Sequence, residues 1–312
     1  MRTIRTIHEI ELEGGLIANM RWSPDGSLLA IPTESGSIVI FEKEKGSVLR
    51  TIGHHEGRVT AVAWDRKGEC ILTGSVDLSI GLWRVATGER APFTIQGHAM
   101  PVHTIEWTDE EAYAITCSAD RLRVLDGACL LAGWRKEDED RVNEVASFVV
   151  ASCSRQSTFL MAFVADDGRL LRLVSLISGD ILSSSQLSSS ARCVAWSPAG
   201  DVLATGDDSG VSLRQCTQEG FEGVPIRLCE PGKPVRAVSF APGGEFLAAA
   251  DDDGIEVWRL RNRRRAASYV NPRSSVAPVP VFHPFEPLVA VTDPSGHKLL
   301  LLDLSEAIPS IA

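Results

Sequence analysis

One aromatic position recurs through the chain at almost constant spacing. The motif around it combines alternating apolar residues, the aromatic residue and a turn. It is clearest at residues 20–26, 62–68, 194–200 and 238–244. The full column consists of Trp22, Trp64, Trp107, Phe148, Trp196, Phe240 and Phe282. Its spacings are 42, 43, 41, 48, 44 and 42 residues. The 312 residues therefore divide into seven copies of a unit of about 45 residues.

Each unit contains short strand-like segments separated by turn residues. In the second unit, residues 59–65 alternate apolar and polar side chains, and residues 70–75, 79–84 and 90–95 supply three further strands. Turn residues recur about every ten positions, and no amphipathic helix separates the strands. The pattern predicts an all-β protein, a seven-bladed β-propeller of four-stranded antiparallel blades, in which only short strand edges are exposed.

The two ends of the chain suggest how such a ring would close. The last unit ends near Leu304 without a fourth strand, and an extra strand-like segment precedes the first unit. We infer that residues 1–13 complete the last blade and that the N-terminal strand closes the ring. Residues 1–304 would then form a single propeller domain, and residues 305–312 a C-terminal tail.

The fourth unit departs from the common length. Its second anchor, Leu173, follows Phe148 by 25 residues, whereas Trp83 follows Trp64 by 19. This difference predicts an insertion of five or six residues near residues 151–158.

The second unit carries the most specific motif. Its motif residues are His55, Thr73, Asp77 and Trp83. This unit resembles the WD40 repeat, although His54 stands where the family has Gly and Arg84 where it has Asp. The resemblance implies a hydrogen-bonded network of these four residues inside one blade. In such a network the Asp accepts from the His, and the indole N–H is not buried without a partner.

The same residue types also invite a catalytic interpretation. A His, an Asp and a hydroxyl residue occur together in catalytic triads, but a triad is defined by exposed geometry and roles rather than by residue types. We interpret the network as a structural brace and predict no catalytic residue. Unit 3 has His98, Thr116 and Asp120 but Leu125 in place of Trp, so its network is incomplete.

Composition narrows the range of partners. The net charge of −10 and the pI of about 5.3 do not favour binding to nucleic acid or an anionic membrane. An arginine-rich run at residues 259–265 lacks interleaved aromatics and is interpreted as a solvated outer hairpin, with a minor contact site as the alternative.

The cysteines and the N-terminus bear on cofactors and compartment. Seven scattered cysteines without a C-x-x-C pair predict neither a zinc site nor a disulfide framework. The sequence has no apolar run of membrane-spanning length, and its first residues lack a signal-peptide pattern. We expect a cytoplasmic protein without a cofactor or metal.

The register of the repeat also defines a candidate binding face. In a propeller, the loops that enter the innermost strands and those between the second and third strands share one face around the central channel. The residues one past the apolar start of each innermost strand are Ala18, Thr60, His103, Asn143, Arg192, Arg236 and Ala277. Of this column, the candidate binding residues at the channel rim are Thr60, His103, Asn143, Arg192 and Arg236.

Two interpretations of Arg192 and Arg236 stay open. In the first, each arginine pairs with an aspartate of the nearby turns at 207–208 and 251–252 and only ties loops together. In the second, the two arginines receive an acidic or phosphorylated group of a protein or peptide partner.

The function predicted from these features is a scaffold that mediates protein–protein interaction through the channel-rim face. The first alternative is a propeller enzyme of the metal-dependent hydrolase or lactonase type, which would need several carboxylates converging in the channel. The second alternative is the sensor module of a larger signalling system, because a fold alone does not assign function.

Overall fold

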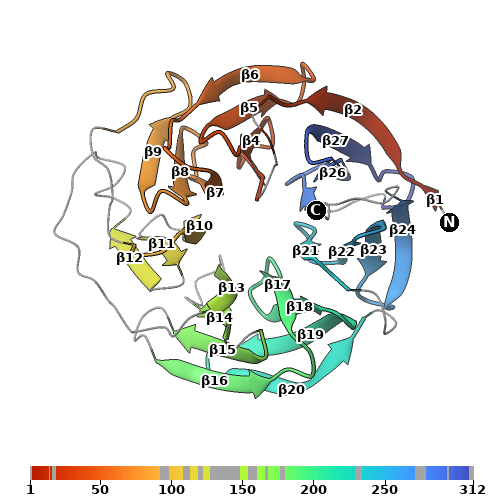
Figure 1. Cartoon of the computed structure of the whole chain (residues 1–312). Helices are drawn as coiled ribbons and strands as arrows, with labels where there is room; N and C mark the ends of the chain where they lie inside the picture. The colour runs from red at the N-terminus through yellow and green to blue at the C-terminus, as the bar shows by residue number, and fades with distance from the viewer. Residues whose placement is uncertain are drawn as a thin grey trace.

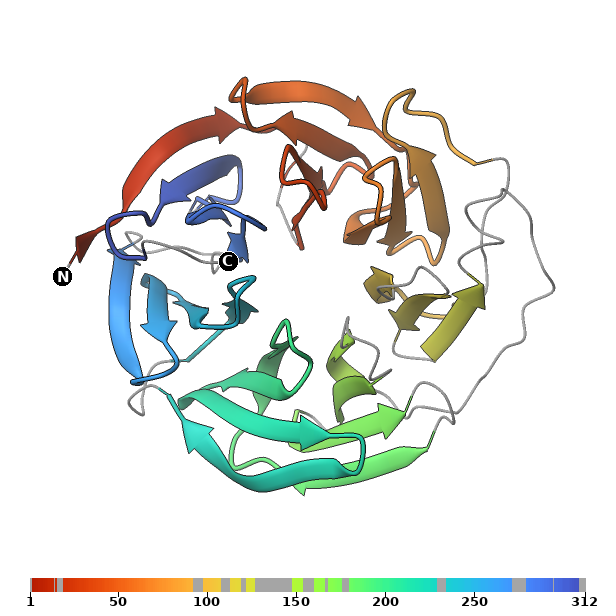
Figure 2. The same ribbon diagram turned by 180° about the vertical axis from the view of Figure 1, so that it is seen from behind.

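The computed structural model describes residues 2–13, 15, 19–91, 98–107, 113–118, 122–126, 148–153, 160–165, 168–175, 180–228, 234–270, 279–293 and 295–308. Every named element in these ranges is a β-strand. Hydrogen bonds join the described strands into seven sheets, which stand around a central axis from either side (Figures 1 and 2). None of the described residues forms a helix with the length and apolar character needed to cross a membrane. This arrangement is the all-β propeller that the repeat predicts.

The sheets are numbered here as blades in the order of their innermost strands. Blade 1 contains β3 (Arg21–Trp22), β4 (Leu28–Pro32), β5 (Ile38–Glu42) and β6 (Ser47–Ile52). Blade 2 contains β7 (Val59–Trp64), β8 (Cys70–Ser75) and β9 (Ile80–Arg84). Blade 3 contains β10 (Val102–Trp107), β11 (Tyr113–Ser118) and β12 (Leu122–Asp126). Most of the fourth strand expected at 90–95 lies outside the described residues.

The remaining blades have at least four described strands each. Blade 4 contains β13 (Phe148–Cys153), β14 (Leu160–Ala165), β15 (Leu170–Ser175) and β16 (Ile181–Gln186). Blade 5 contains β17 (Ala191–Trp196), β18 (Val202–Asp207), β19 (Gly210–Thr217) and β20 (Gly220–Arg227). Blade 6 contains β21 (Ala237–Phe240), β22 (Phe246–Asp251), β23 (Gly254–Arg259), β24 (Arg264–Val270) and β1 (Arg2–Thr3). Blade 7 contains β25 (Val281–Phe282), β26 (Leu288–Thr292), β27 (Lys298–Asp303) and β2 (Arg5–Glu11).

Burial differs systematically between the middle and the outer strands. All six residues of β8 and all six of β14 are buried, whereas most residues of the outer strands β6 and β20 are exposed. A strand covered on both faces needs a continuous apolar or small-residue run, and a strand at the edge does not. The sequence of each unit follows this rule from the inside of the blade outward.

Blade 4 differs from its predicted register. Trp64 and Trp107 end their innermost strands, opposite Ile71 and Ala114 respectively. In blade 4 Phe148 begins β13, and Cys153 occupies the end position opposite Met161. The insertion was predicted because Phe148 was aligned with these tryptophans by residue type. Register is set by backbone pairing, which aligns Cys153 with them instead.

The N-terminal segment pairs with two different blades. β1 runs parallel to β24, with Arg2 opposite Ala267, and β2 runs antiparallel to β27, with Glu9 opposite Leu300. A segment far from β27 in sequence thereby supplies the outer strand of blade 7, on the outside of the ring (Figure 1).

Side chains also join blade 7 to blade 1. The Trp22 indole N–H donates to the Val281 carbonyl (3.3 Å), as the Trp64 indole donates to the Arg21 carbonyl between blades 1 and 2 (2.9 Å). His283 is buried, lies edge-on to Trp22 and has its Nε2 2.9 Å from the Gly26 carbonyl oxygen. The two blades therefore share the kind of contact that joins consecutive blades elsewhere.

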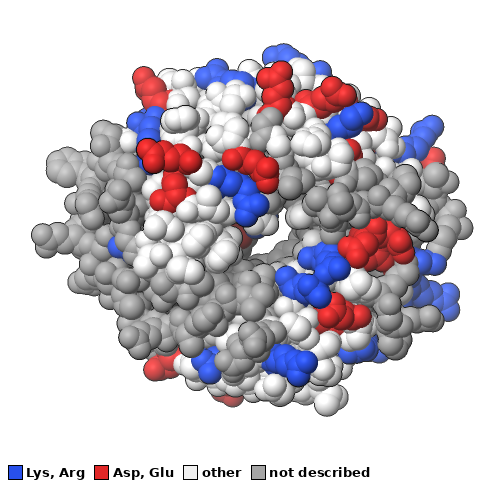
Figure 3. Space-filling view, viewed as in Figure 1, with Lys and Arg blue, Asp and Glu red and all other residues white. Residues whose placement is uncertain are grey.

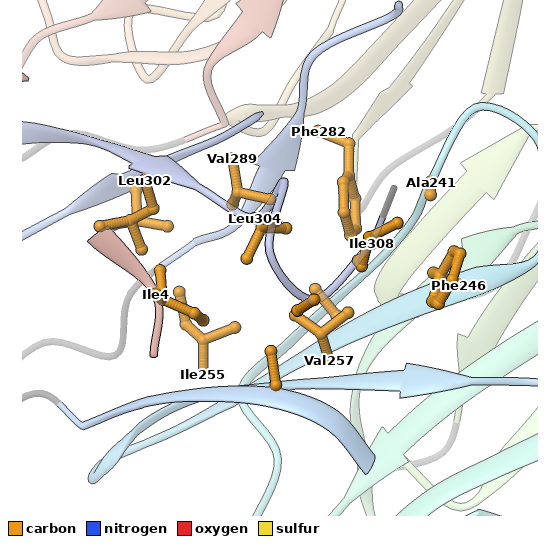
Figure 4. Close-up of a cluster of buried hydrophobic side chains, with 14 of the residues drawn as sticks. Ile4, Ala241, Phe246, Ile255, Val257, Phe282, Val289, Leu302, Leu304 and Ile308 are labelled. Carbon is orange, nitrogen blue, oxygen red and sulfur yellow. The ribbon is translucent and has the colours of Figure 1, made fainter. Parts of the chain in front are cut away.

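The C-terminal segment is packed rather than being the expected tail. Leu304, Ala307 and Ile308 are buried in the cluster between blades 6 and 7, which also contains Ile4 from the N-terminus and Phe282 (Figure 4). Apolar side chains at 304, 307 and 308 explain the difference, because they remove apolar surface from water that neither blade could cover alone. Residues 309–312 lie outside the described residues.

Deletion of residues 1–13 is expected to abolish cooperative unfolding, because it removes β1, β2 and the buried Ile4 together. The measurement is thermal unfolding followed by circular dichroism. A truncated chain with an unchanged melting transition would contradict the role of this segment.

Substitution of the fully buried Ile308 by alanine is expected to lower the free energy of unfolding by about 3 kcal/mol, through lost burial and a residual cavity. Urea titration measures this change. The matched control is Ile181→Ala, at a position that is 53% exposed, where an effect of about 0.5 kcal/mol or less is expected. Equal effects at both positions would contradict the packed C-terminus.

Candidate functional site at the channel rim

A β-bulge shapes the start of several innermost strands. The strand register shifts at Thr60 in blade 2, at His103 in blade 3, at residue 149 in blade 4 and at Arg192 in blade 5. A bulge leaves one residue outside the regular pairing and re-aims its side chain. Arg236 directly precedes β21 and donates its backbone N–H to the Ala250 carbonyl (2.8 Å).

Two of these rim positions carry equivalent ion pairs. Arg192 donates from Nε to Asp208 Oδ1 (2.8 Å) and from Nη2 to Asp208 Oδ2 (3.4 Å). Arg236 donates in the same way to Asp252, at 3.2 and 3.3 Å. Each aspartate follows its arginine by 16 residues, and the second pair repeats the first one blade later. Of the two interpretations left open by the sequence, the structure therefore contains the loop-tying pairs.

The turns that carry these aspartates are built alike. Asp207 Oδ1 accepts from the backbone N–H of Ser209 (2.7 Å), and Asp251 Oδ1 accepts from the backbone N–H of Asp253 (2.9 Å). The first aspartate of each turn thus holds the turn closed. The second aspartate of each turn pairs with the arginine.

The two ion pairs also interact with each other. The hydrogen bond from Arg192 holds the pKa of Asp208 below its ordinary value, and the charge of Arg236 contributes to the same shift. The pKa of Arg192 is correspondingly raised, first by Asp208. Basic and acidic side chains lie together beside the central opening over β17 and β21 (Figure 3). The four side chains form one exposed cluster of alternating charge, which we call the rim cluster.

The other predicted rim residues have different roles. The Thr60 hydroxyl faces the Gly74 carbonyl (3.1 Å) and the Val102 carbonyl, so it is used within the fold, between blades 2 and 3. His103 is exposed, and its pKa is lowered by partial desolvation and by the charge of Arg58. Asn143 lies outside the described residues, and the bulge of blade 4 falls at residue 149 instead. The rim position in blade 4 was predicted wrongly because it was counted from Phe148, which had been aligned with the wrong end of its strand.

Sequence reasoning missed two exposed apolar residues on this face. Leu78 is 38% exposed and has a positive φ of 71°, and its turn position is occupied in blade 1 by Gly36, with φ of 88°. Met100 is 48% exposed and stands where blade 2 has Gly57. The two positions correspond because the Met100 carbonyl accepts a hydrogen bond from Ser118 and the Gly57 carbonyl accepts one from Ser75. Comparing the turns of successive repeats residue by residue would have found both.

The bracing network of blade 2 forms a continuous chain of contacts. His55 Nδ1 lies 3.0 Å from Asp77 Oδ2, and its Nε2 lies 2.7 Å from Thr73 Oγ1. The Trp83 indole N–H donates to the same hydroxyl (2.8 Å). With a proton on Nδ1, a neutral His55 donates to Asp77 and accepts from Thr73, which satisfies every group. His55, Thr73 and Trp83 are buried, and Asp77 is partly exposed.

A glycine makes room for this network, and blade 3 replaces it. A Cβ at Gly81 would lie 2.7 Å from the Trp83 indole nitrogen, so any larger residue would displace the ring. In blade 3 the corresponding position, opposite Thr116, is Arg123, which is buried. This residue is compatible with the blade because Leu125 stands in place of the Trp. The His98–Thr116 contact remains, at 2.9 Å.

The described residues show no sign of a metal centre or an activated thiol. Among them, no three His, Cys, Asp or Glu side chains lie close enough together to hold a metal ion. Burial raises the pKa of the Cys193 thiol to about 12, so it is protonated at neutral pH.

Comparison with solved structures places the fold. The β-propeller domain of Cps50 (Swd1) from Myceliophteria thermophila superimposes with a TM-score of 0.80 over 96% of this chain and 99% of that one, at 16% sequence identity. The chain therefore has the β-propeller fold.

Sequence comparison identifies the repeat. The family described as WD domain, G-beta repeat, matches residues 179–213 and 224–259, and the anaphase-promoting complex subunit 4 WD40 domain matches residues 3–67. The F-box-like/WD repeat-containing proteins TBL1Y of Homo sapiens and TBL1X of Mus musculus are 32% and 33% identical over 107 residues, or 33% of this chain. The matched stretch spans 19% of either relative. The matched segments of this chain are therefore similar to WD40 repeats.

The stability of the protein is expected to fall as the pH drops from 7.5 to 5.5. Burial lowers the pKa of His55 below its ordinary value of 6.5, although Asp77 partly opposes this, and burial lowers the pKa of His283 as well. The unfolded chain therefore takes up protons at a pH where the native chain does not, and this difference favours unfolding. The pKa of Asp77 is itself lowered, so its contribution persists throughout this range.

The measurement is urea unfolding at both pH values, with His55→Asn as the comparison. This variant should lose about 2 kcal/mol at pH 7.5, because Thr73 and Asp77 lose a partner, and should show a smaller difference between the two pH values. An unchanged pH dependence would contradict the assignment of a neutral buried His55.

Proposed function

We propose that this protein is a WD40-repeat scaffold that binds a protein partner through the channel-rim face and that it has no catalytic activity of its own. The observation that carries the proposal is the rim cluster. Two arginine–aspartate pairs of the same geometry stand on adjacent blades and are exposed at the opening of the channel. Exposed ion pairs contribute little to stability, so their repetition on one face is better explained by contact with a partner.

The geometry of the pairs leaves binding capacity on each arginine. Both guanidinium groups use Nε and Nη2 for their aspartate. Within the described part of the chain, the Nη1 side of each group has no hydrogen-bond partner. A carboxylate or phosphate of a partner can accept from this second edge without displacing the aspartate. The aspartates hold the arginines in place, which reduces the entropy lost on binding.

Apolar residues on the same face support a protein rather than a small-molecule partner. Leu78 and Met100 are both exposed, at turn positions where neighbouring blades have glycine. A leucine at positive φ costs conformational energy of about 1 kcal/mol. A large apolar side chain at such a position supports a role as a contact in an interface.

The enzyme alternative has less support. A metal-dependent hydrolase on this fold would need convergent carboxylates or histidines, and the described residues contain no such group of three. The relatives and the family matches are WD-repeat proteins. We also propose a cytoplasmic location, which the free buried cysteines Cys70, Cys117, Cys193 and Cys216 support.

The double variant Arg192→Ala/Arg236→Ala is expected to lose partner proteins that wild type captures from cell extract, as measured by affinity capture and quantitative mass spectrometry. The matched control is Lys67→Ala/Arg84→Ala, which removes the same charge from exposed positions on the opposite face. Capture of the same proteins in the same amounts by wild type and the rim variant would refute the proposed face.

A further inference from the structure

A second charged surface lies on the opposite face, at the hairpin between β23 and β24. The turns between the third and fourth strands point away from the rim face, because neighbouring strands of a blade are antiparallel. β24 lies on the outer side of the ring (Figure 1). Residues 259–265 contain five of the chain's 31 lysines and arginines and no acidic residue. We call this segment the basic hairpin.

Among the described residues, ion pairs account for two of these arginines. Arg259 lies 3.8 Å from Glu245, and Arg265 lies 2.6 Å from Glu256. Arg261, Arg263 and Arg264 are exposed, and no acidic side chain in the described part of the chain lies within ion-pair distance of them. Three positive charges without an acidic partner among the described residues therefore lie at one tip of a protein with a net charge of −10.

The backbone at the tip gives a second, independent observation. Arg263 has a positive φ of 53°, and its N–H donates to the Leu260 carbonyl (3.3 Å). The same turn in blade 1 has Gly46, with φ of 61° and an N–H donating to the Lys43 carbonyl (3.1 Å). In blade 2 the position is Gly88, with φ of 77°. An arginine thus occupies a position for which glycine is the unstrained residue, at an exposed site where no packing requires it.

The surroundings restrict the kind of anion that fits. The corresponding turns of blades 1, 2 and 5 carry the exposed acids Glu44, Glu89 and Glu219. A long or flat polyanion, such as nucleic acid or a membrane surface, would meet these acids and scattered basic residues such as Lys67 and Arg84 as well as the arginines of the tip. A short acidic segment would touch only the tip. Guanidinium groups bind carboxylates through paired hydrogen bonds, which favours such a segment.

We infer that the basic hairpin, through Arg261, Arg263 and Arg264, is a docking site for a short segment of a partner protein rich in aspartate and glutamate. The site is separate from the rim cluster and goes beyond the proposed function. It would let one propeller hold two partners on opposite faces, with the fold as the spacer between them.

The test uses a fluorescein-labelled ten-residue peptide in which glutamate and aspartate alternate with serine, titrated against the full chain by fluorescence anisotropy. Arg261→Gln/Arg264→Gln should weaken binding about tenfold, because charge-assisted hydrogen bonds are lost. Lys67→Gln/Arg84→Gln removes the same charge from the same face and should leave the affinity within about twofold of wild type, since exposed charges beyond about 10 Å are screened.

Arg263→Gly separates binding from folding. It should weaken peptide binding while leaving the melting temperature equal to or above that of wild type, because the strained φ is relieved. Unchanged affinity in both hairpin variants, or equal weakening by the control pair, would overturn the inference.

Two comparisons distinguish the remaining possibilities. If Arg192→Ala/Arg236→Ala loses peptide binding while the hairpin variants keep it, the hairpin inference fails and the proposed rim function stands. Labelled single-stranded DNA and phosphatidylserine vesicles should bind more weakly than the peptide. Tighter binding of either to wild type, lost in the hairpin variants, would overturn the choice of an acidic protein segment.

Discussion

Burial of both faces of each blade against its neighbours is the constraint on which the rest of this structure depends. The middle strands β8 and β14 are covered at every residue, so no blade could exist with a neighbour missing. A line of blades would leave two such faces in water, and a ring leaves none. The cluster between blades 6 and 7 reflects this demand, since Ile4 near one end of the chain and Ile308 near the other are both buried in it.

The repeat made most of the fold predictable because each unit states its own pattern of apolar and turn residues. The spacing of the aromatic residues identified the units. The structure confirmed that the apolar and small-residue runs of β8 and β14 are buried at every residue. The errors occurred where residue type and register diverge. Phe148 was aligned as an end-of-strand aromatic but begins its strand, and this error moved the expected rim residue to Asn143. The packing of Ala307 and Ile308 was missed because two apolar residues in a short segment show no periodicity.

The candidate site was predictable in position but not in geometry. Register placed Arg192 and Arg236 at the rim, and the acidic turns suggested their partners. Sequence could not say that each arginine would use Nε and Nη2, which leaves the opposite edge open. Arg192 lies at the bulge before Cys193, and Asp208 follows the Asp207 side chain that closes its turn. Leu78 was missed for a related reason, because its φ becomes visible only when successive turns are compared.

The positive-φ residues show how such a ring can diversify. The turn geometry is imposed by the strands on either side, which are held by their own pairing and by the next blade, so one unfavourable residue does not unfold the turn. Glycine is the unstrained choice, as at Gly36 and Gly46, whereas Leu78 and Arg263 keep the same backbone at a cost. Both side chains reach solvent, on opposite faces. A scaffold that tolerates strain at its turns can place different chemistry on each face without altering its core.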